Sequence, residues 1–231
     1  ITPCDVAETN CTDGGDNDGD FLIDCDDSDC SVHSRCNPYQ GVYELFDIDP
    51  DFIDLEGVTL TFTPDAAAPS GYRVEGTDAT AYPVAVGSGT TSTVTGLGNT
   101  ESQEYAFAHL PSFDFYGTTY SRFFVSSEGY LTFDTGDTWV VDSESELFRH
   151  PTICGLCEST DAGDGVVTID ETSTSVAVTF AGVPFAAETP ENDWQILLHS
   201  DGRIQITYLS IPELGLDSYD IVVVGIGAGE G

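Results

Sequence analysis

The stretch WQILLHSDGRIQITY, residues 194–208, decides the fold class. Two runs rich in aliphatic and aromatic residues, Trp194–Leu198 and Arg203–Tyr208, flank the segment His199–Gly202. Asp-Gly between two such runs is a hairpin signal, because glycine readily adopts the positive φ angles that a tight turn needs. The stretch therefore predicts two antiparallel strands joined by a short turn.

Similar runs recur on both sides of this hairpin. From about residue 39 onward, apolar and aromatic residues alternate with Thr, Ser and acidic residues, and turn-forming residues interrupt them at short intervals. The further predicted strands are 58–62, 122–125, 130–133, 166–169, 175–180 and 221–226. Only Ser143–Arg149 predicts a short helical turn. We expect an all-β domain over residues 39–231, an antiparallel β-sandwich.

Residues 1–38 form a different unit, with little apolar content and a dense acidic run. Residues 13–30 read DGGDNDGDFLIDCDDSDC and hold eight carboxylates in eighteen residues, which would repel one another without a cation among them. With Asp16 as position 1, the oxygen-donor positions of a twelve-residue calcium loop are filled by Asp16, Asp18, Asp20, the Leu22 carbonyl, Asp24 and Asp27. The spacing predicts Ca²⁺ as a cofactor of this unit.

Two positions depart from the usual calcium loop. Phe21 stands where glycine normally permits a sharp turn, and Asp27 replaces the usual bidentate Glu. Ile23 fits the position at which such loops turn an apolar side chain inward. The alternative is a solvated acidic tail, which explains neither the spacing nor the cysteines among the acids.

The seven cysteines indicate disulfides and an oxidising compartment. They are Cys4, Cys11, Cys25, Cys30, Cys36, Cys154 and Cys157. Zinc is the alternative, but cysteines within an Asp-rich run lie among hard oxygen ligands that favour calcium. The odd number leaves at least one cysteine free or paired with another molecule. Asn10 begins an Asn-Cys-Thr sequon that fits glycosylation in a secreted protein, or matches it by chance.

The pair Cys154-Gly-Leu-Cys157 has the spacing of a redox motif. A thioredoxin-like role needs a helix N-terminus that lowers a thiol pKa, and the surrounding sequence predicts none. We therefore expect a disulfide that closes a loop.

The net charge of −36, with five Arg and no Lys, excludes nucleic acid as a partner, because little could neutralise its phosphates. Anionic membrane surfaces would repel the chain. No apolar run approaches the roughly 20 residues of a membrane helix, so we expect no membrane insertion. A chain without Met that starts at Ile1 is typical of a processed secreted protein or of an excised segment.

Several weaker patterns are open to two interpretations. The acidic run 47–54 fits a solvated strand face or a second calcium site, and residues 161–165 fit a plain turn. Residues 76–104, rich in Gly, Thr and Ser, fit a long loop or edge strands completed by a partner. Trp139 and Trp194 fit core or edge packing better than a sugar platform. No Ser lies in a G-x-S-x-G elbow and no His pair has metal-ligand spacing, so we expect no enzyme.

Two resemblances follow from these residues. Glu8–Cys30 resembles the cysteine-bracketed calcium repeats of secreted bacterial or archaeal surface proteins and, more distantly, thrombospondin type 3 repeats and dockerin loops. The segments FDFYGTTY (113–120), VSSEGYLTF (125–133) and 194–204 resemble a nidogen-like β-sandwich domain over residues 105–231. Glu128 stands where that family has Asn. The second resemblance implies an accessory or surface module without fixed catalytic residues.

These observations favour an extracellular calcium-binding structural protein that self-associates into a cell-surface filament or layer. We expect a strand from Val84–Leu97 or from Ile221–Ile226 to pair across a subunit boundary. The alternative is a non-catalytic accessory or ligand-binding module of a secreted hydrolase or adhesin, with surface proteins or glycans as partners.

Overall fold

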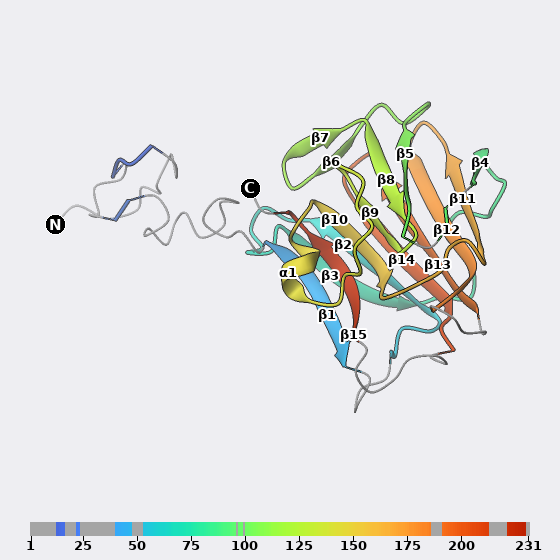
Figure 1. The fold of residues 1–231 in the computed structure, drawn as a ribbon. Coiled ribbons are helices and arrows are strands. Elements are labelled where there is room, and N and C mark those ends of the chain that lie inside the picture. The colour runs from blue at the N-terminus through green and yellow to red at the C-terminus, as the bar shows by residue number, and fades with distance from the viewer. Residues whose placement is uncertain are drawn as a thin grey trace.

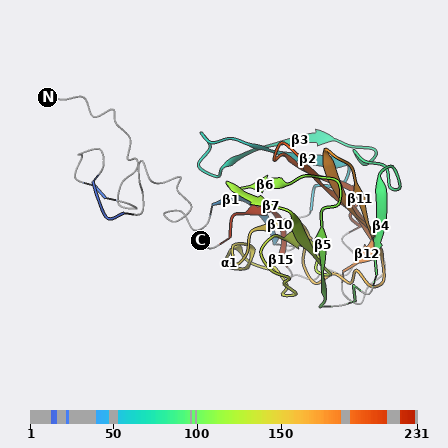
Figure 2. The ribbon, with the colours of Figure 1, turned by 90° about the horizontal axis from the view of Figure 1, so that it is seen from above.

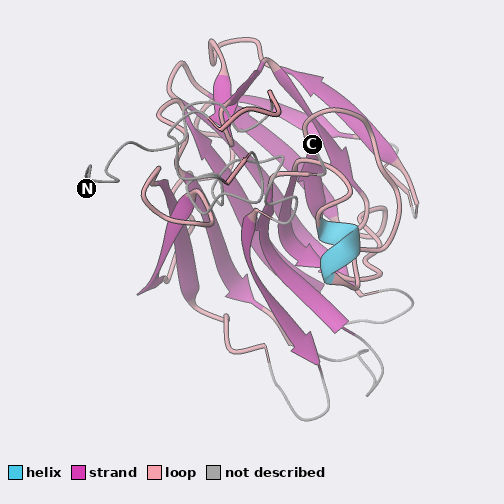
Figure 3. Ribbon diagram, turned by 90° about the vertical axis from the view of Figure 1, so that its left-hand side faces the viewer, coloured by secondary structure: helices cyan, strands magenta, loops and turns pink. Residues whose placement is uncertain are grey.

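The computed structural model describes residues 13–16, 22–23, 40–47, 53–95, 97–98, 100–185, 191–212 and 221–229. It confirms the all-β sandwich: two antiparallel sheets pack face to face (Figures 1 and 2). In the described part of the chain the helical content is a single short turn, α1 (Glu144–Leu147), as predicted (Figure 3). None of the described helices is long and apolar enough to cross a membrane.

The six-stranded sheet has the order β1-β15-β10-β9-β8-β5. Its strands are β1 (Gly41–Asp47), β15 (Ile221–Gly227), β10 (Thr152–Cys157), β9 (Tyr130–Thr132), β8 (Arg122–Ser126) and β5 (Ser102–Ala106). The seven-stranded sheet has the order β3-β2-β14-β13-β12-β11-β4. Its strands are β3 (Tyr72–Asp78), β2 (Val58–Pro64), β14 (Ile204–Ser210), β13 (Glu191–His199), β12 (Ser175–Pro184), β11 (Val166–Glu171) and β4 (Thr90–Val94).

The hairpin predicted from residues 194–208 lies at the centre of the seven-stranded sheet as β13 and β14. Trp194 is fully buried and stacks on Phe180 of β12 with ring centroids 4.5 Å apart. Ile204, Ile206 and Tyr208 alternate along β14 and are also fully buried. Burying such side chains contributes about 1.5–3 kcal/mol each, so this alternation holds the hairpin in register against the core.

A short hairpin closes one end of the sandwich. It consists of β6 (Phe113–Phe115) and β7 (Thr118–Tyr120). Phe115 packs against Tyr72 of β3 and against Phe133, which follows β9, so the hairpin contacts elements of both sheets. Figure 1 shows β6 and β7 at that end of the molecule.

The final strand differs from one sequence prediction. We expected Ile221–Ile226 to pair across a subunit boundary, but β15 is paired with β1 on one side and β10 on the other. Val222 and Val223 are fully buried, as their continuous apolar run predicted. This strand therefore has no free edge to offer another chain, and that part of the prediction is wrong.

The Gly-, Thr- and Ser-rich segment 76–104 contains edge strands, one of its two predicted forms. β4 is the last strand of the seven-stranded sheet and β5 is the last strand of the other. Between β3 and β4, residues 79–89 form a long connection without strands.

Candidate functional site

Most of the predicted calcium loop lies outside the described residues. Asp18, Asp20, Asp24 and Asp27 are among those outside, as are Asn10 and the cysteines at 4, 11, 25, 30 and 36. Asp16 and Leu22 are described, and both are solvent-exposed. Within the described ranges, no group of three or more His, Cys, Asp or Glu is placed to hold a metal ion. The calcium loop remains a prediction.

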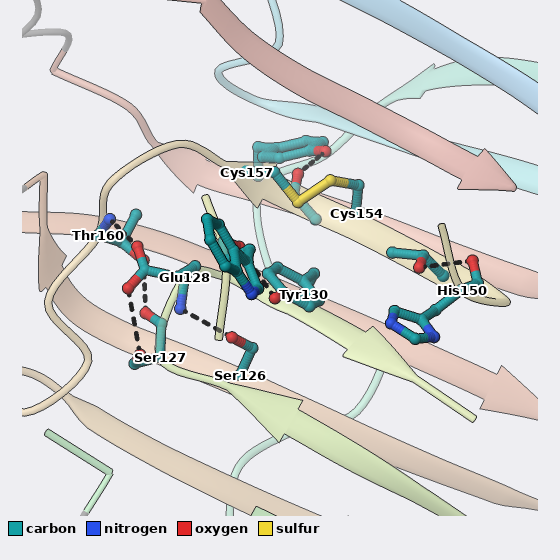
Figure 4. Close-up of a disulfide and its surroundings, with 12 residues drawn as sticks. Ser126, Ser127, Glu128, Tyr130, His150, Cys154, Cys157 and Thr160 are labelled. Atoms are coloured by element: carbon teal, nitrogen blue, oxygen red, sulfur yellow. Dashed lines mark hydrogen bonds between the residues drawn. A yellow bond between two sulfur atoms is a disulfide. The ribbon is translucent and has the colours of Figure 1, made fainter. Parts of the chain in front are cut away.

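Cys154 and Cys157 form a disulfide, as predicted, but in a strand rather than a loop. Both residues are fully buried in β10, where the pairing with β15 shifts register between them (Figure 4). This bulge places two residues of β10 opposite one residue of β15, and the cysteine Cα atoms lie 5.5 Å apart, within the usual range for a disulfide. Their burial removes the sulfur atoms from solvent, which suits a structural bond rather than a redox motif.

Glu128 is a buried carboxylate beside this disulfide (Figure 4). Its two carboxylate oxygens accept hydrogen bonds from the Ser127 hydroxyl at 3.3 Å and the Thr160 amide at 3.2 Å. Burial raises the pKa of Glu128, and these hydrogen bonds offset only part of that effect. Sequence reasoning noticed Glu128 as a departure from a resemblance but gave it no role. It joins the turn after β8 to the segment that follows β10.

Glu171, at the end of β11, is a buried carboxylate with four hydrogen-bond donors. It accepts from the backbone amides of Ala108, His109 and Leu110 at 2.7–3.0 Å and from the Tyr105 hydroxyl at 2.8 Å. Burial alone would raise the pKa of Glu171, but these bonds outweigh it and the pKa is lowered. The carboxylate thereby ties the segment after β5 to the seven-stranded sheet.

Two further side chains hold the long connection 79–89 against the same sheet. Asp170 accepts hydrogen bonds from the Gly87 amide at 2.9 Å and the Thr91 hydroxyl at 2.5 Å. The Gln195 amide pairs with both the N–H and the C=O of Val84, at 3.2 and 2.8 Å. The alternation of Gln195 with buried apolar neighbours could have predicted that its side chain lies on the outer face of β13. The sequence could not have predicted its partner, Val84, which is more than a hundred residues away.

A surface cluster surrounds Arg149, which follows α1. Arg149 lies over the Trp139 ring at 5.1 Å and pairs with Glu146 and Asp137. We expected core or edge packing for both tryptophans; Trp194 is fully buried in the core, whereas Trp139 is 65% exposed and lies outside it. The cluster joins α1 to the preceding loop through partly buried ion pairs, each of which contributes about 1 kcal/mol.

A cavity of about 580 Å³ lies at the surface of the described structure, within the size range of ligand sites. It lies where three turns meet: the β2–β3 turn, the tip of the β6–β7 hairpin and the β13–β14 turn. The β2–β3 turn contributes the carboxylate of Asp65, strand β6 of the short hairpin that of Asp114, and the β13–β14 turn that of Asp201. Two tyrosines, Tyr72 and Tyr116, contribute aromatic rings to the lining of the cavity.

Tyr116 has an unusual backbone conformation. Its φ angle is 48° and that of Gly117 is 79°, so the two residues form the tight hairpin turn in which both central residues have positive φ. A bulky side chain with positive φ is rare and costs conformational energy. The ring is held against Tyr72, with centroids 5.0 Å apart, and its hydroxyl is buried without a hydrogen-bond partner in the described structure.

Together these observations define a β-sandwich protein with a buried disulfide, buried carboxylates that anchor its loops and a cavity lined by carboxylates and tyrosines. A 71-residue stretch, 30% of the chain, is 42% identical to teneurin-3 of Danio rerio, and 73 residues are 45% identical to teneurin-3 of Mus musculus. The chain spans only 2% of the length of these curated relatives. No family model and no solved structure matches the chain.

Proposed function

We propose that this chain is an extracellular, calcium-binding structural protein that self-associates into a cell-surface filament or layer. The buried Cys154–Cys157 disulfide supports an oxidising compartment. The Asp-rich segment 13–30, with its resemblance to thrombospondin type 3 and dockerin loops, supports calcium binding. The β-sandwich, with its nidogen-like sequence segments, supports a scaffold or surface module.

The observation that carries self-association is the composition of one sheet edge. β1, β5, β3 and β4 are the four edge strands of the two large sheets. Three of them carry charges that discourage strand addition: Glu44 and Asp47 in β1, Glu104 in β5, and Arg73, Glu75 and Asp78 in β3. β4, with the sequence TTSTV, carries neither a charge nor a proline, so its free backbone edge is the least protected.

The surroundings of β4 fit an extended partner. A groove of about 140 Å³ runs between β4 and β5, lined by Val94, Tyr105, Val125 and Ile169 among others. Free backbone donors and acceptors of an edge strand recognise another backbone rather than a particular side chain. A strand from a second copy of the chain could therefore extend the seven-stranded sheet at this point.

A lysine at the edge tests this interface. Thr93→Lys puts a charge on an exposed position of β4, whereas Thr77→Lys puts the same charge on the already charged edge of β3. Light scattering and negative-stain microscopy in calcium should show assembly of the parent chain and of Thr77→Lys, and loss of assembly by Thr93→Lys. A parent chain that stays monomeric at high concentration, or equal assembly by both variants, would overturn the proposed interface.

Chelation tests the calcium component separately. Without Ca²⁺, the carboxylates of residues 13–30 repel one another, by roughly 1 kcal/mol for each pair about 4 Å apart in water. EGTA should increase proteolysis within residues 13–30, and Mg²⁺ should restore resistance poorly because it demands a tighter octahedral shell. Asp18→Asn with Asp20→Asn should mimic EGTA, with Asp78→Asn as a control outside the segment. Unchanged cleavage in EGTA would exclude a calcium loop.

The alternative, a non-catalytic ligand-binding or accessory module, is favoured by the cavity at the meeting of the three turns.

A further inference from the structure

The 580 Å³ cavity offers mainly hydrogen-bond acceptors on its polar side. Asp114 accepts from the Thr119 hydroxyl at 2.6 Å through one carboxylate oxygen, Oδ1. Asp65 accepts from the Ala67 amide at 3.0 Å and pairs with Arg73. Since an ionised carboxylate accepts about four hydrogen bonds, each retains acceptor sites for a ligand that donates.

The charge at the cavity is largely balanced locally. Asp65 is paired with Arg73, and Asp201 with Arg203 at 2.9 Å. Burial alone would raise the pKa of Asp201, but hydrogen bonds and charge from Arg203 lower it, so this carboxylate is ionised at neutral pH. Asp114 has no arginine in its described hydrogen bonds. The lining therefore carries one uncompensated negative charge, which excludes anions and gives cations only a weak attraction.

The two tyrosines supply the apolar contact. Burial raises the pKa of both Tyr72 and Tyr116, so both phenols are neutral, and the Tyr72 hydroxyl donates to the Gly202 carbonyl at 3.4 Å. The Tyr116 hydroxyl has no hydrogen-bond partner in the described structure, although it is buried. Aromatic rings next to fixed acceptors recognise a molecule with alternating C–H faces and hydroxyl groups.

We propose that this cavity is a binding site for a neutral oligosaccharide, whose hydroxyl groups donate to Asp65, Asp114 and Asp201 and whose ring packs on Tyr116. The strained conformation of Tyr116 is retained because it holds the ring in the cavity wall. The proposal is independent of calcium binding and of self-association, since none of the residues that it uses belongs to segment 13–30 or to β4.

The decisive variant is Tyr116→Asn. Asn-Gly is the preferred sequence for a turn with two positive φ angles, so this change removes the ring while it suits the backbone better than Tyr does. We expect the variant to unfold at the same temperature as the parent chain or higher, and to bind the oligosaccharide roughly tenfold more weakly or worse. Trp139→Ala, which removes an exposed aromatic ring that does not line the cavity, should leave binding unchanged.

Binding is measured with the full chain by calorimetry and ligand-observed NMR against neutral, acidic and aminated oligosaccharides. Asp114→Asn replaces one acceptor oxygen of the site with an amide donor and removes the uncompensated charge, so neutral sugars should bind several-fold more weakly but remain detectable. Binding confined to aminated sugars and lost in Asp114→Asn would show a cation site and overturn the proposal. So would failure of every neutral sugar to bind at millimolar concentration, or parent affinity in Tyr116→Asn.

Discussion

At the scale of single residues, the pKa values of two buried glutamates, Glu171 and Glu128, are shifted in opposite directions. Glu171 receives four donors and its pKa is lowered, whereas Glu128 receives fewer and its pKa is raised by burial. A carboxylate with a lowered pKa stabilises the fold above its ordinary pKa, and one with a raised pKa destabilises it there. The two residues should therefore affect the pH dependence of stability in opposite directions.

Glu171→Gln should destabilise the protein at pH 7 by about 1–3 kcal/mol, because charge-assisted bonds to backbone amides are replaced by weaker ones. The contribution of Glu171 is complete above its ordinary pKa of 4.5 and is lost as the pH falls through the lower folded-state value. Urea unfolding from pH 7 to pH 3 should show the difference between parent and variant shrinking. Glu104→Gln, at an exposed ion pair, is the control and should change stability little. A constant difference across this range would contradict the assignment.

Glu128→Gln should stabilise the protein at pH 7, by on the order of 1 kcal/mol, because it removes a buried charge and keeps an acceptor oxygen. The folded state holds the Glu128 proton to a higher pH than the unfolded chain, so the penalty develops as the pH rises from 4.5 through the raised pKa. Thermal unfolding should show a gain at pH 7 that disappears near pH 4. Glu75→Gln, at an exposed position of β3, is the control and should show no such pH dependence. A loss of stability at pH 7 in Glu128→Gln would refute the prediction.

These two roles illustrate what the sequence does not reveal. An acidic residue at the end of an apolar run is usually solvated, and nothing near Glu171 in the sequence identifies the amides of Ala108–Leu110 as its partners. The cavity is similar, since Asp65, Asp114 and Asp201 come from three separate hairpins. The turn at His199–Gly202 was predictable from local chemistry, but its approach to the other two turns depends on how the strands are ordered.

At the scale of elements, the eight strands predicted from apolar alternation are all present. They contain runs of buried or alternately buried apolar side chains, which are the signal that the prediction uses. The strands that were not predicted include β3, which is largely exposed, and β10, in which all six residues are buried, whereas β4 was predicted only as one of two possible forms of segment 76–104. Edge strands lack a buried face, and a short strand interrupted by glycine and cysteines resembles a loop.

The connection 79–89 depends on a single side chain for its central contact with the sheet. Gln195→Ala should leave the Val84 N–H and C=O without their partners. Because few other contacts hold this connection, its backbone should then open to solvent more often. Hydrogen exchange should accelerate over residues 82–91 and change little in the buried core of β13. Gln205→Ala, a half-buried glutamine on the adjacent strand that bonds His199 and Thr61, should leave the connection protected. Equal exchange in the two variants would show that Gln195 does not anchor the segment.

At the scale of the whole molecule, the net charge of −36 opposes compact folding by self-repulsion. The chain has five arginines and no lysine against 41 acidic residues, so most of the negative charge has no basic partner. The same repulsion opposes contact between copies of the chain. Ionic strength should therefore control both stability and association.

In EGTA, the unfolding temperature should rise by several degrees between 0.01 and 0.5 M NaCl, because the screening length falls from about 30 Å to well under 10 Å. Tetramethylammonium chloride should have the same effect as NaCl if screening is responsible, since it cannot occupy a small cation site. Differential scanning calorimetry measures both series. An unfolding temperature that does not change with salt concentration, or that rises with NaCl but not with tetramethylammonium chloride, would contradict a screening effect.

The pairing of the first and last strands has a mechanical consequence. Gly41 at the start of β1 lies opposite Gly227 at the end of β15, and the Ala228 amide donates to the Gln40 carbonyl at 2.9 Å. A force that pulls these two positions apart would break the hydrogen bonds between β1 and β15 one after another, starting from this end, rather than loading all of them at once in shear. The sandwich should yield there at low force, with β1 peeling away first. The disulfide within β10 lies outside this path and would leave the extension unrestrained.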